Sequence, residues 1–186
     1  MSTAIAPAVI TAEQFAEMSF DEPCELVRGE IVEITRPDQS HGNACARVAF
    51  AMMQWAYANR CGQVITNDSG ILTERDPDSL RGADVAFFAA SQLPDSKLPR
   101  GPVSIVPVLA VEVLSPLNSW SQMRRKIAEY LAAGVHEVWI VDPDCRTVEA
   151  FRSDAAPVLF RTQMSLVSRE LPEFTASVSE LFAGVE

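Results

Sequence analysis

An acidic residue stands inside an apolar run near the middle of the chain. Glu112 follows Val-Leu-Ala-Val and precedes Val-Leu, a pattern typical of a strand that is buried on both faces. Because an isolated ionised carboxylate is expensive to bury, it must be paired, protonated or bound to a cation. Glu112 therefore needs a chemical partner.

Asp84 offers a second carboxylate, in the apolar run Ala-Asp-Val-Ala-Phe-Phe. If the two runs form neighbouring strands, the carboxylates converge, and hard oxygen ligands of this kind suit Mg²⁺ or Mn²⁺. The simpler alternative is that Asp84 caps a strand end and that Glu112 pairs with an arginine. The spacing alone does not separate these two interpretations.

A lysine follows the second acid at helical spacing. Gln122, Lys126 and Tyr130 are four residues apart, so they share one face of a predicted helix. Lys126 would then reach over the end of the Glu112 strand, where a lysine can assist water activation and neutralise charge on a phosphate. Taken alone, Lys126 is more simply explained as a solvated surface lysine.

The helices that must position these residues follow from apolar spacing and capping residues. A capping box that begins at Thr11 predicts a helix from Ala12 to Met18. The longest helix is expected from His41 to Arg60. Another runs from Ser119 to Ala133 before a glycine, and a short helix follows at 178–182.

Strands are expected at 24–28, 30–35, 84–89, 108–114, 138–141, 147–152 and 158–161, with two more inside 63–73. The first two should form a tight hairpin at Gly29. The two strands inside 63–73 would enclose Asp68-Ser69-Gly70, and a polar loop would follow from Asp76 to Gly82. A second loop, 91–107, contains four prolines. Strand, helix and strand over 108–141 predict a parallel crossover.

Length and composition predict one domain, residues 1–186, because 48% of its 186 residues are hydrophobic. A net charge of −10 opposes non-specific attraction to nucleic acid. A DNA-binding face must therefore be local, and the adjacent Arg124, Arg125 and Lys126 are more simply a solvated face. No apolar stretch reaches the roughly 18 residues of a membrane span. Met1–Val9 lacks the features of a signal peptide, so we expect a soluble, cytoplasmic protein.

The four cysteines indicate no zinc-ligand cluster. They show no Cys-x-x-Cys spacing, and His41 and His136 are the two histidines. Buried or idle thiols in a reducing compartment are favoured over a metal or redox role.

The order of these motifs resembles a known family. The matching text is Glu25-Leu-Val-Arg-Gly-Glu-Ile, Ser40-His41 at a helix start, Asp84-Val, Val111-Glu-Val-Leu-Ser-Pro, Lys126-Ile-Ala-Glu-Tyr, Gly134-Val and Glu137-Val-Trp-Ile-Val-Asp-Pro. It is similar to the putative restriction endonuclease family of bacteria, a branch of the PD-(D/E)XK nuclease superfamily. The resemblance covers about residues 25–143, and the Glu-Val-Leu-Ser-Pro run with Trp-Ile-Val-Asp-Pro is its most specific part.

The resemblance implies an α/β (α+β) fold with a restriction-endonuclease-like core at about 25–143. A central mixed β-sheet would be flanked by helices, with an N-terminal β-hairpin region. Asp84 and Glu112 would bind Mg²⁺ or Mn²⁺, with the backbone carbonyl of Val113 as a third oxygen. The superfamily lysine stands two residues after the acid, where this chain has Leu114. In this branch its role moves to the next helix, which matches Lys126.

Further residues support this pattern or depart from it. Glu25 and His41 match it and would complete the metal or water shell, although each alone is more simply a surface acid and a helix-start hydrogen-bonding group. Tyr130 is a further supporting residue. Gln122 stands where an aspartate is common, so it keeps a hydrogen-bonding group near Lys126 but removes a negative charge. Ala83 replaces a proline that is not a ligand.

The leading hypothesis is a Mg²⁺-dependent endonuclease that hydrolyses DNA, as a homodimer because cutting both strands needs two sites. The alternative is a binding or regulatory module that kept the fold and lost turnover, which the acidic charge and Gln122 favour. A third reading, a glycosidase built on the paired carboxylates, fits less well, because a buried valine-rich strand followed by a lysine suits phosphate chemistry better.

Overall fold

The computed structural model describes residues 9–101, 105–116 and 119–184. Residues 1–8, which form most of the N-terminal segment predicted to lack signal-peptide features, and Pro102 of the predicted proline-containing loop lie outside these ranges. The helices are α1 (Ala12–Glu17), α2 (Gln39–Asn59), α3 (Trp120–Ala133) and α4 (Val178–Leu181), with short 3-10 helices at Ala90–Gln92 and Pro94–Ser96. None of the helices in these ranges is long and apolar enough to span a membrane.

The strands are β1 (Cys24–Val27), β2 (Glu30–Glu33), β3 (Gly62–Glu74), β4 (Ser79–Ala89), β5 (Leu109–Val113), β6 (Glu137–Asp142), β7 (Thr147–Arg152), β8 (Ala155–Arg161), β9 (Ser165–Val167) and β10 (Thr175–Ser177). The first eight form one sheet in the order β2-β1-β4-β5-β6-β7-β8, with β3 also paired to β4. Strands β9 and β10, which the sequence did not predict, form a separate antiparallel pair. The long strand β4 is therefore the branch point of the sheet.

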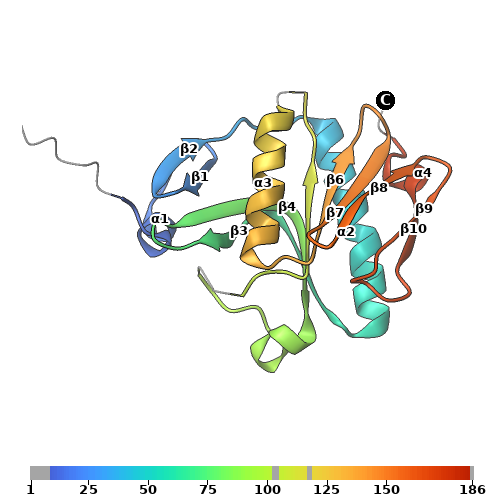
Figure 1. The fold of residues 1–186 in the computed structure, drawn as a ribbon, viewed down its shortest axis with the longest axis horizontal. Helices are drawn as coiled ribbons and strands as arrows, with labels where there is room; N and C mark the ends of the chain where they lie inside the picture. Colours follow the sequence, from blue (N-terminus) through green and yellow to red (C-terminus); the bar gives the residue numbers. More distant parts are fainter. Residues whose placement is uncertain (1–8, 102–104, 117–118, 185–186) are drawn as a thin grey trace, which may run out of the picture.

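The sheet lies between α2 on one face and α3 on the other (Figure 1). Alternate residues of β5 serve the two layers, as the two-residue period of a strand requires. Val111 and Val113 pack in the cluster that contains α2, whereas Ala110 packs in the cluster that contains α3. This arrangement confirms the expected central mixed sheet with flanking helices, and it turns Glu112 toward α3.

Two local predictions are confirmed. Strands β1 and β2 form the expected hairpin, in which Arg28 and Gly29 have φ angles of 51° and 78°. Positive φ at both central residues matches the twist of a two-residue hairpin turn. Strands β5 and β6 pair in parallel across α3, as the strand, helix and strand order predicted.

Two other predictions are wrong. Residues 63–73 do not form two strands around a turn, because β3 runs unbroken from Gly62 to Glu74 against β4. The turn-forming residues near Asp68 produce a shift of register between Thr66 and Ser69 instead. The predicted polar loop from Asp76 to Gly82 is also too long, because β4 begins at Ser79. Arg81, which lies in the segment predicted as a polar loop, is buried among carboxylates.

Two adjacent methionines of α2 test how this helix contributes to stability. Met52 is fully buried under the sheet, whereas 53% of Met53 is exposed. We expect Met52→Ala to lower the free energy of unfolding by about 2 to 5 kcal/mol, because it leaves a cavity in the core. Met53→Ala should change it by about 0.5 kcal/mol or less. Urea denaturation followed by circular dichroism measures both, and equal losses would contradict this packing.

Candidate metal-dependent active site

The two predicted acids meet between neighbouring strands. Val85 of β4 pairs with Val111 of β5 in an antiparallel register, so Asp84, the residue before Val85, lies opposite Glu112, the residue after Val111. The N–H of Val113 donates a hydrogen bond to Oδ2 of Asp84 at 2.6 Å. Both acids are buried. The sheet register thus holds two carboxylates together at one edge of the core.

Helix α3 supplies two partners to Glu112. Nζ of Lys126 lies 3.0 Å from Oε2 of Glu112, and the hydroxyl of Tyr130 donates to Oε1 at 2.7 Å. Lys126 and Tyr130 are one helical turn apart, as their spacing predicted. The side chain paired with Glu112 is therefore this lysine, not an arginine as in the simpler alternative.

Glu25 of β1 belongs to the same group and is not a surface acid. Its Oε1 lies 2.9 Å from Nζ of Lys126 and accepts a hydrogen bond from the N–H of Gly82 at 3.0 Å. Lys126 also donates to the carbonyl of Gly82 at 3.2 Å. The ammonium group therefore joins β1, β4 and β5 to α3.

A second cation, which was not predicted from the sequence, contacts the other oxygen of Glu25. Arg81 lies 2.8 Å from Oε2 of Glu25 and binds Glu129 of α3 through two hydrogen bonds of 2.6 and 2.9 Å. A guanidinium group suits this forked geometry. Glu129 follows Lys126 at a spacing of three on the helix, a signal that could have been read, whereas Arg81 was assigned to a loop.

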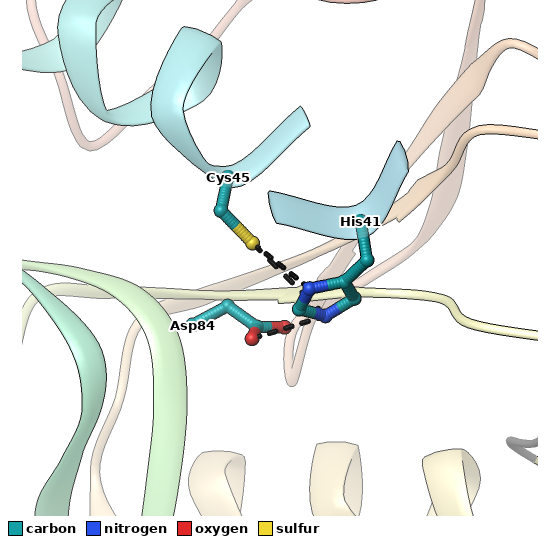
Figure 2. Close-up of side chains that lie close together, drawn as sticks. All are labelled: His41, Cys45 and Asp84. Carbon is teal, nitrogen blue, oxygen red and sulfur yellow. Dashed lines mark hydrogen bonds and ion pairs between the residues drawn. The ribbon is translucent and has the colours of Figure 1, made fainter. Parts of the chain in front are cut away.

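His41 enters from the other helix. Asp38 caps the start of α2 by accepting a hydrogen bond from the N–H of His41 at 3.0 Å. The ring then points its Nε2 to Oδ1 of Asp84 at 3.2 Å, while Nδ1 lies 3.5 Å from the sulfur of Cys45 (Figure 2). Cys45, one turn after His41, is a second residue that sequence reasoning did not include in the site.

The side chain of Gln122 bonds to Ser119 at the start of α3, whereas its place in the family pattern predicted a hydrogen-bonding group for Lys126. Its side-chain oxygen accepts hydrogen bonds from the N–H and the hydroxyl of Ser119, at 3.1 and 2.9 Å. These bonds form a capping box that begins α3. Gln122 thus fixes the helix start, while Lys126 is held by Glu25 and Glu112.

Burial and neighbouring charges shift the proton affinities of these groups. Burial and the charge of Asp84 raise the pKa of Glu112 from 4.5 to about 7, although Lys126 and Tyr130 act in the opposite direction. Burial alone would lower the pKa of Lys126, but Glu112 and Glu25 outweigh it and hold this pKa above its usual value. Lys126 therefore stays protonated at neutral pH.

The pKa values of His41 and Cys45 are both raised by the same neighbouring carboxylates. Burial disfavours protonation of His41, but its contact with Asp84 and the charges of Asp84, Asp68 and Glu112 leave its pKa raised. Burial and then the charge of Asp84 raise the pKa of the Cys45 thiol. Excess negative charge therefore surrounds this end of α2.

The charged groups line a cleft of about 270 Å³, whose walls include Glu25, His41, Asp84, Glu112 and Lys126. A larger hollow of about 520 Å³ lies at the other end of α2, and Arg60 is the charged residue in its lining. The smaller cleft is therefore the better candidate for chemistry.

The donor set fits a hard divalent cation. Asp84 and Glu112 provide carboxylate oxygens, which Mg²⁺ and Mn²⁺ prefer. The charge of Asp84 contributes to the raised pKa of Glu112, and a bound cation would relieve this repulsion. The contact of the Val113 carbonyl with such an ion stays a prediction.

Comparison with known proteins identifies the family. The family model described as Uma2, putative restriction endonuclease, matches residues 12–179. The chain belongs to the Uma2 family. This membership confirms the resemblance carried by the sequence motifs and supports a nuclease. No curated protein matches the chain.

One solved structure similar to this Uma2 member is a crystal structure of a putative nuclease belonging to DUF820 from Anabaena variabilis. The two chains superpose with a TM-score of 0.80 at 21% sequence identity, over 94% of this chain and 98% of the other. At this identity the comparison establishes the fold.

Removal of the shared ammonium group should expose its stabilising role. We expect Lys126→Met to lower the free energy of unfolding by about 3 to 5 kcal/mol at pH 8, because Glu25 and Glu112 lose a buried partner. The loss should shrink at pH 5. The pKa of Glu112 is raised from 4.5 to about 7 in the folded protein, so its protonation stabilises the folded state at low pH, and this contribution is lost as the pH rises through about 7. At pH 5 Glu112 is therefore protonated and does not need the charge of Lys126, whereas at pH 8 it does.

Urea denaturation at both pH values measures this effect. Arg125→Met is the matched control, because Arg125 is an exposed neighbour on α3, and its substitution should cost about 0.5 kcal/mol or less. A loss for Lys126→Met that is the same at pH 5 and pH 8 would show that Glu112 does not take up the proton.

Proposed function

We propose that the chain is a Mg²⁺-dependent endonuclease that hydrolyses phosphodiester bonds of DNA. Asp84, Glu112 and the carbonyl of Val113 would hold the ion, and Lys126 would assist the attacking water. One observation carries the proposal: two buried carboxylates from adjacent strands meet a protonated lysine in an open cleft. Membership in the Uma2 family supports it.

When bound, the divalent ion supplies a Lewis acid that polarises the phosphate and favours deprotonation of water. The protein groups hold this arrangement in place. The N–H of Val113 fixes Asp84, and the hydroxyl of Tyr130 fixes Glu112. Substrate binding then requires little rearrangement of the ligands.

Lys126 acts through its charge, not as a proton acceptor. Glu112 and Glu25 hold its pKa above the usual value, so the amine keeps its proton. The ammonium can donate a hydrogen bond to a phosphate oxygen and stabilise the negative charge of the transition state. In the hydrolysis, the water oxygen bonds to phosphorus and gives up a proton to solvent, the bond from phosphorus to the leaving oxygen breaks, and the leaving oxygen takes up a proton.

The alternative, a binding module without turnover, draws its support from the net charge of −10 and from Gln122. The second support is weaker in the folded protein, because Gln122 caps α3 while other groups hold Lys126. The acidic charge favours a local DNA-binding face over a broad one. Cleavage of both strands would be served by a homodimer with two such sites.

Nuclease assays test the proposal directly. Nicking of supercoiled DNA should require Mg²⁺ or Mn²⁺ and fall at least about 100-fold in Asp84→Asn, Glu112→Gln and Lys126→Ala, because each removes charge stabilisation at the reacting phosphate. Asp144→Asn, an exposed acid in the turn after β6, should keep the parental rate. Metal-dependent cleavage that persists in all three variants would contradict the assignment of the active site.

The raised pKa of Glu112 should make metal binding depend on pH. Because this pKa is about 7, protons compete with the ion below neutrality, and Mn²⁺ affinity should be about tenfold weaker at pH 6 than at pH 8. Calorimetric titration measures it. Tyr130→Phe removes a donor to the ionised carboxylate, so the decline should begin at higher pH. Equal affinities at pH 6 and pH 8 would contradict this role of Glu112.

A further inference from the structure

Three side chains of different chemistry converge beside the proposed magnesium ligands. His41 and Cys45 are four residues apart on α2, so they project from the same face. Asp84 reaches them from β4, and one donor atom from each of the three lies within 4.8 Å of the others. Figure 2 shows the imidazole in contact with both the thiol and the carboxylate.

This set differs in kind from the oxygen ligands around Glu112. Nitrogen, sulfur and carboxylate oxygen are the donors that zinc takes in proteins, whereas Mg²⁺ takes oxygen. Three protein ligands also leave the fourth position of a tetrahedral ion open, as in zinc sites that exchange water. The mixed donor set therefore selects a softer ion than Mg²⁺.

The surroundings suit a cation. His41 and Asp84 are buried and line the 270 Å³ cleft, which gives an ion a route to them. Oδ2 of Asp84 is occupied by the N–H of Val113, so Oδ1 is the oxygen that faces His41. The charges of Asp68 and Glu112 act on both His41 and Cys45.

We propose that His41, Cys45 and Asp84 bind one divalent transition-metal ion of the zinc type. The ion would replace the contact between the imidazole and the carboxylate, and the thiol would lose its proton to solvent on binding. Cys45, which the proposed nuclease chemistry does not use, is the ligand that gives the site its preference.

The site has a consequence that rests on the proposed function. Asp84 belongs to both ligand sets, so an ion held by His41 and Cys45 withdraws that carboxylate from the magnesium site. A zinc-type ion would thus oppose Mg²⁺ binding at the same edge of the sheet. Binding itself needs no nuclease activity, and it can be tested without nucleic acid.

Cobalt provides the probe, because Zn²⁺ gives no colour and Co²⁺ adopts the same tetrahedral sites. We expect the metal-free wild-type chain, titrated with Co²⁺, to show a thiolate-to-cobalt charge-transfer band in the near ultraviolet that saturates at one equivalent. One equivalent of Zn²⁺ should abolish the band. Cys45→Ser should lack it and bind Zn²⁺ at least about tenfold more weakly.

Cys61→Ser is the matched control, because Cys61 is a partly buried thiol at the other end of α2, and it should keep the band. Circular dichroism checks that each variant is folded, and Asp84→Asn gives a second ligand variant should Cys45→Ser not fold. Absence of the band in the wild type, or its persistence in folded Cys45→Ser, overturns the site. These results do not depend on whether the chain cleaves DNA.

Discussion

The ammonium group of Lys126 joins four elements of the fold at one point. It contacts Glu25 of β1, Glu112 of β5 and the carbonyl of Gly82 in β4, and it does so from α3. The β1–β2 hairpin shares one register pair with β4, Leu26 with Leu80, and its turn is also held by a hydrogen bond from the N–H of Arg28 to the hydroxyl of Ser79. The charged contacts of Glu25 with Lys126 and Arg81 add to these attachments in orienting the hairpin on the sheet.

The same interaction creates the electrostatic character of the site. Lys126 lies between two carboxylates and remains charged. Its ion pairs with Glu25 and Glu112 compensate the cost of burying these two acids. Burial, and to a lesser extent the charge of Asp84, nevertheless raises the pKa of Glu112 to about 7. Glu112 is thus repelled by Asp84 while it is paired with Lys126, and a bound cation would relieve that repulsion.

Much of this arrangement was accessible from the sequence, and the reasons for the exceptions are physical. Glu112 was noticeable because a single acid interrupts a strand, and Lys126 because helical spacing places it beside Tyr130. Arg81 escaped notice because polar residues usually indicate a loop, whereas here two acids distant in sequence neutralise it. Cys45 was missed although its spacing of four from His41 could have shown it, whereas Asp84, the third member of the group, comes from another element. Spacing reveals neighbours on one helix, but not those that only tertiary packing brings together.

Arg81 binds Glu129 through two hydrogen bonds and Glu25 through one contact. The three residues therefore depend on one another. Replacement of the arginine alone would strand two acids, and replacement of either acid alone would leave a buried cation short of a partner. Within the Uma2 family, a substitution at position 25, 81 or 129 should therefore be accompanied by a substitution at one or both of the others. In an alignment, these three columns should vary together, whereas neighbouring exposed positions should vary independently.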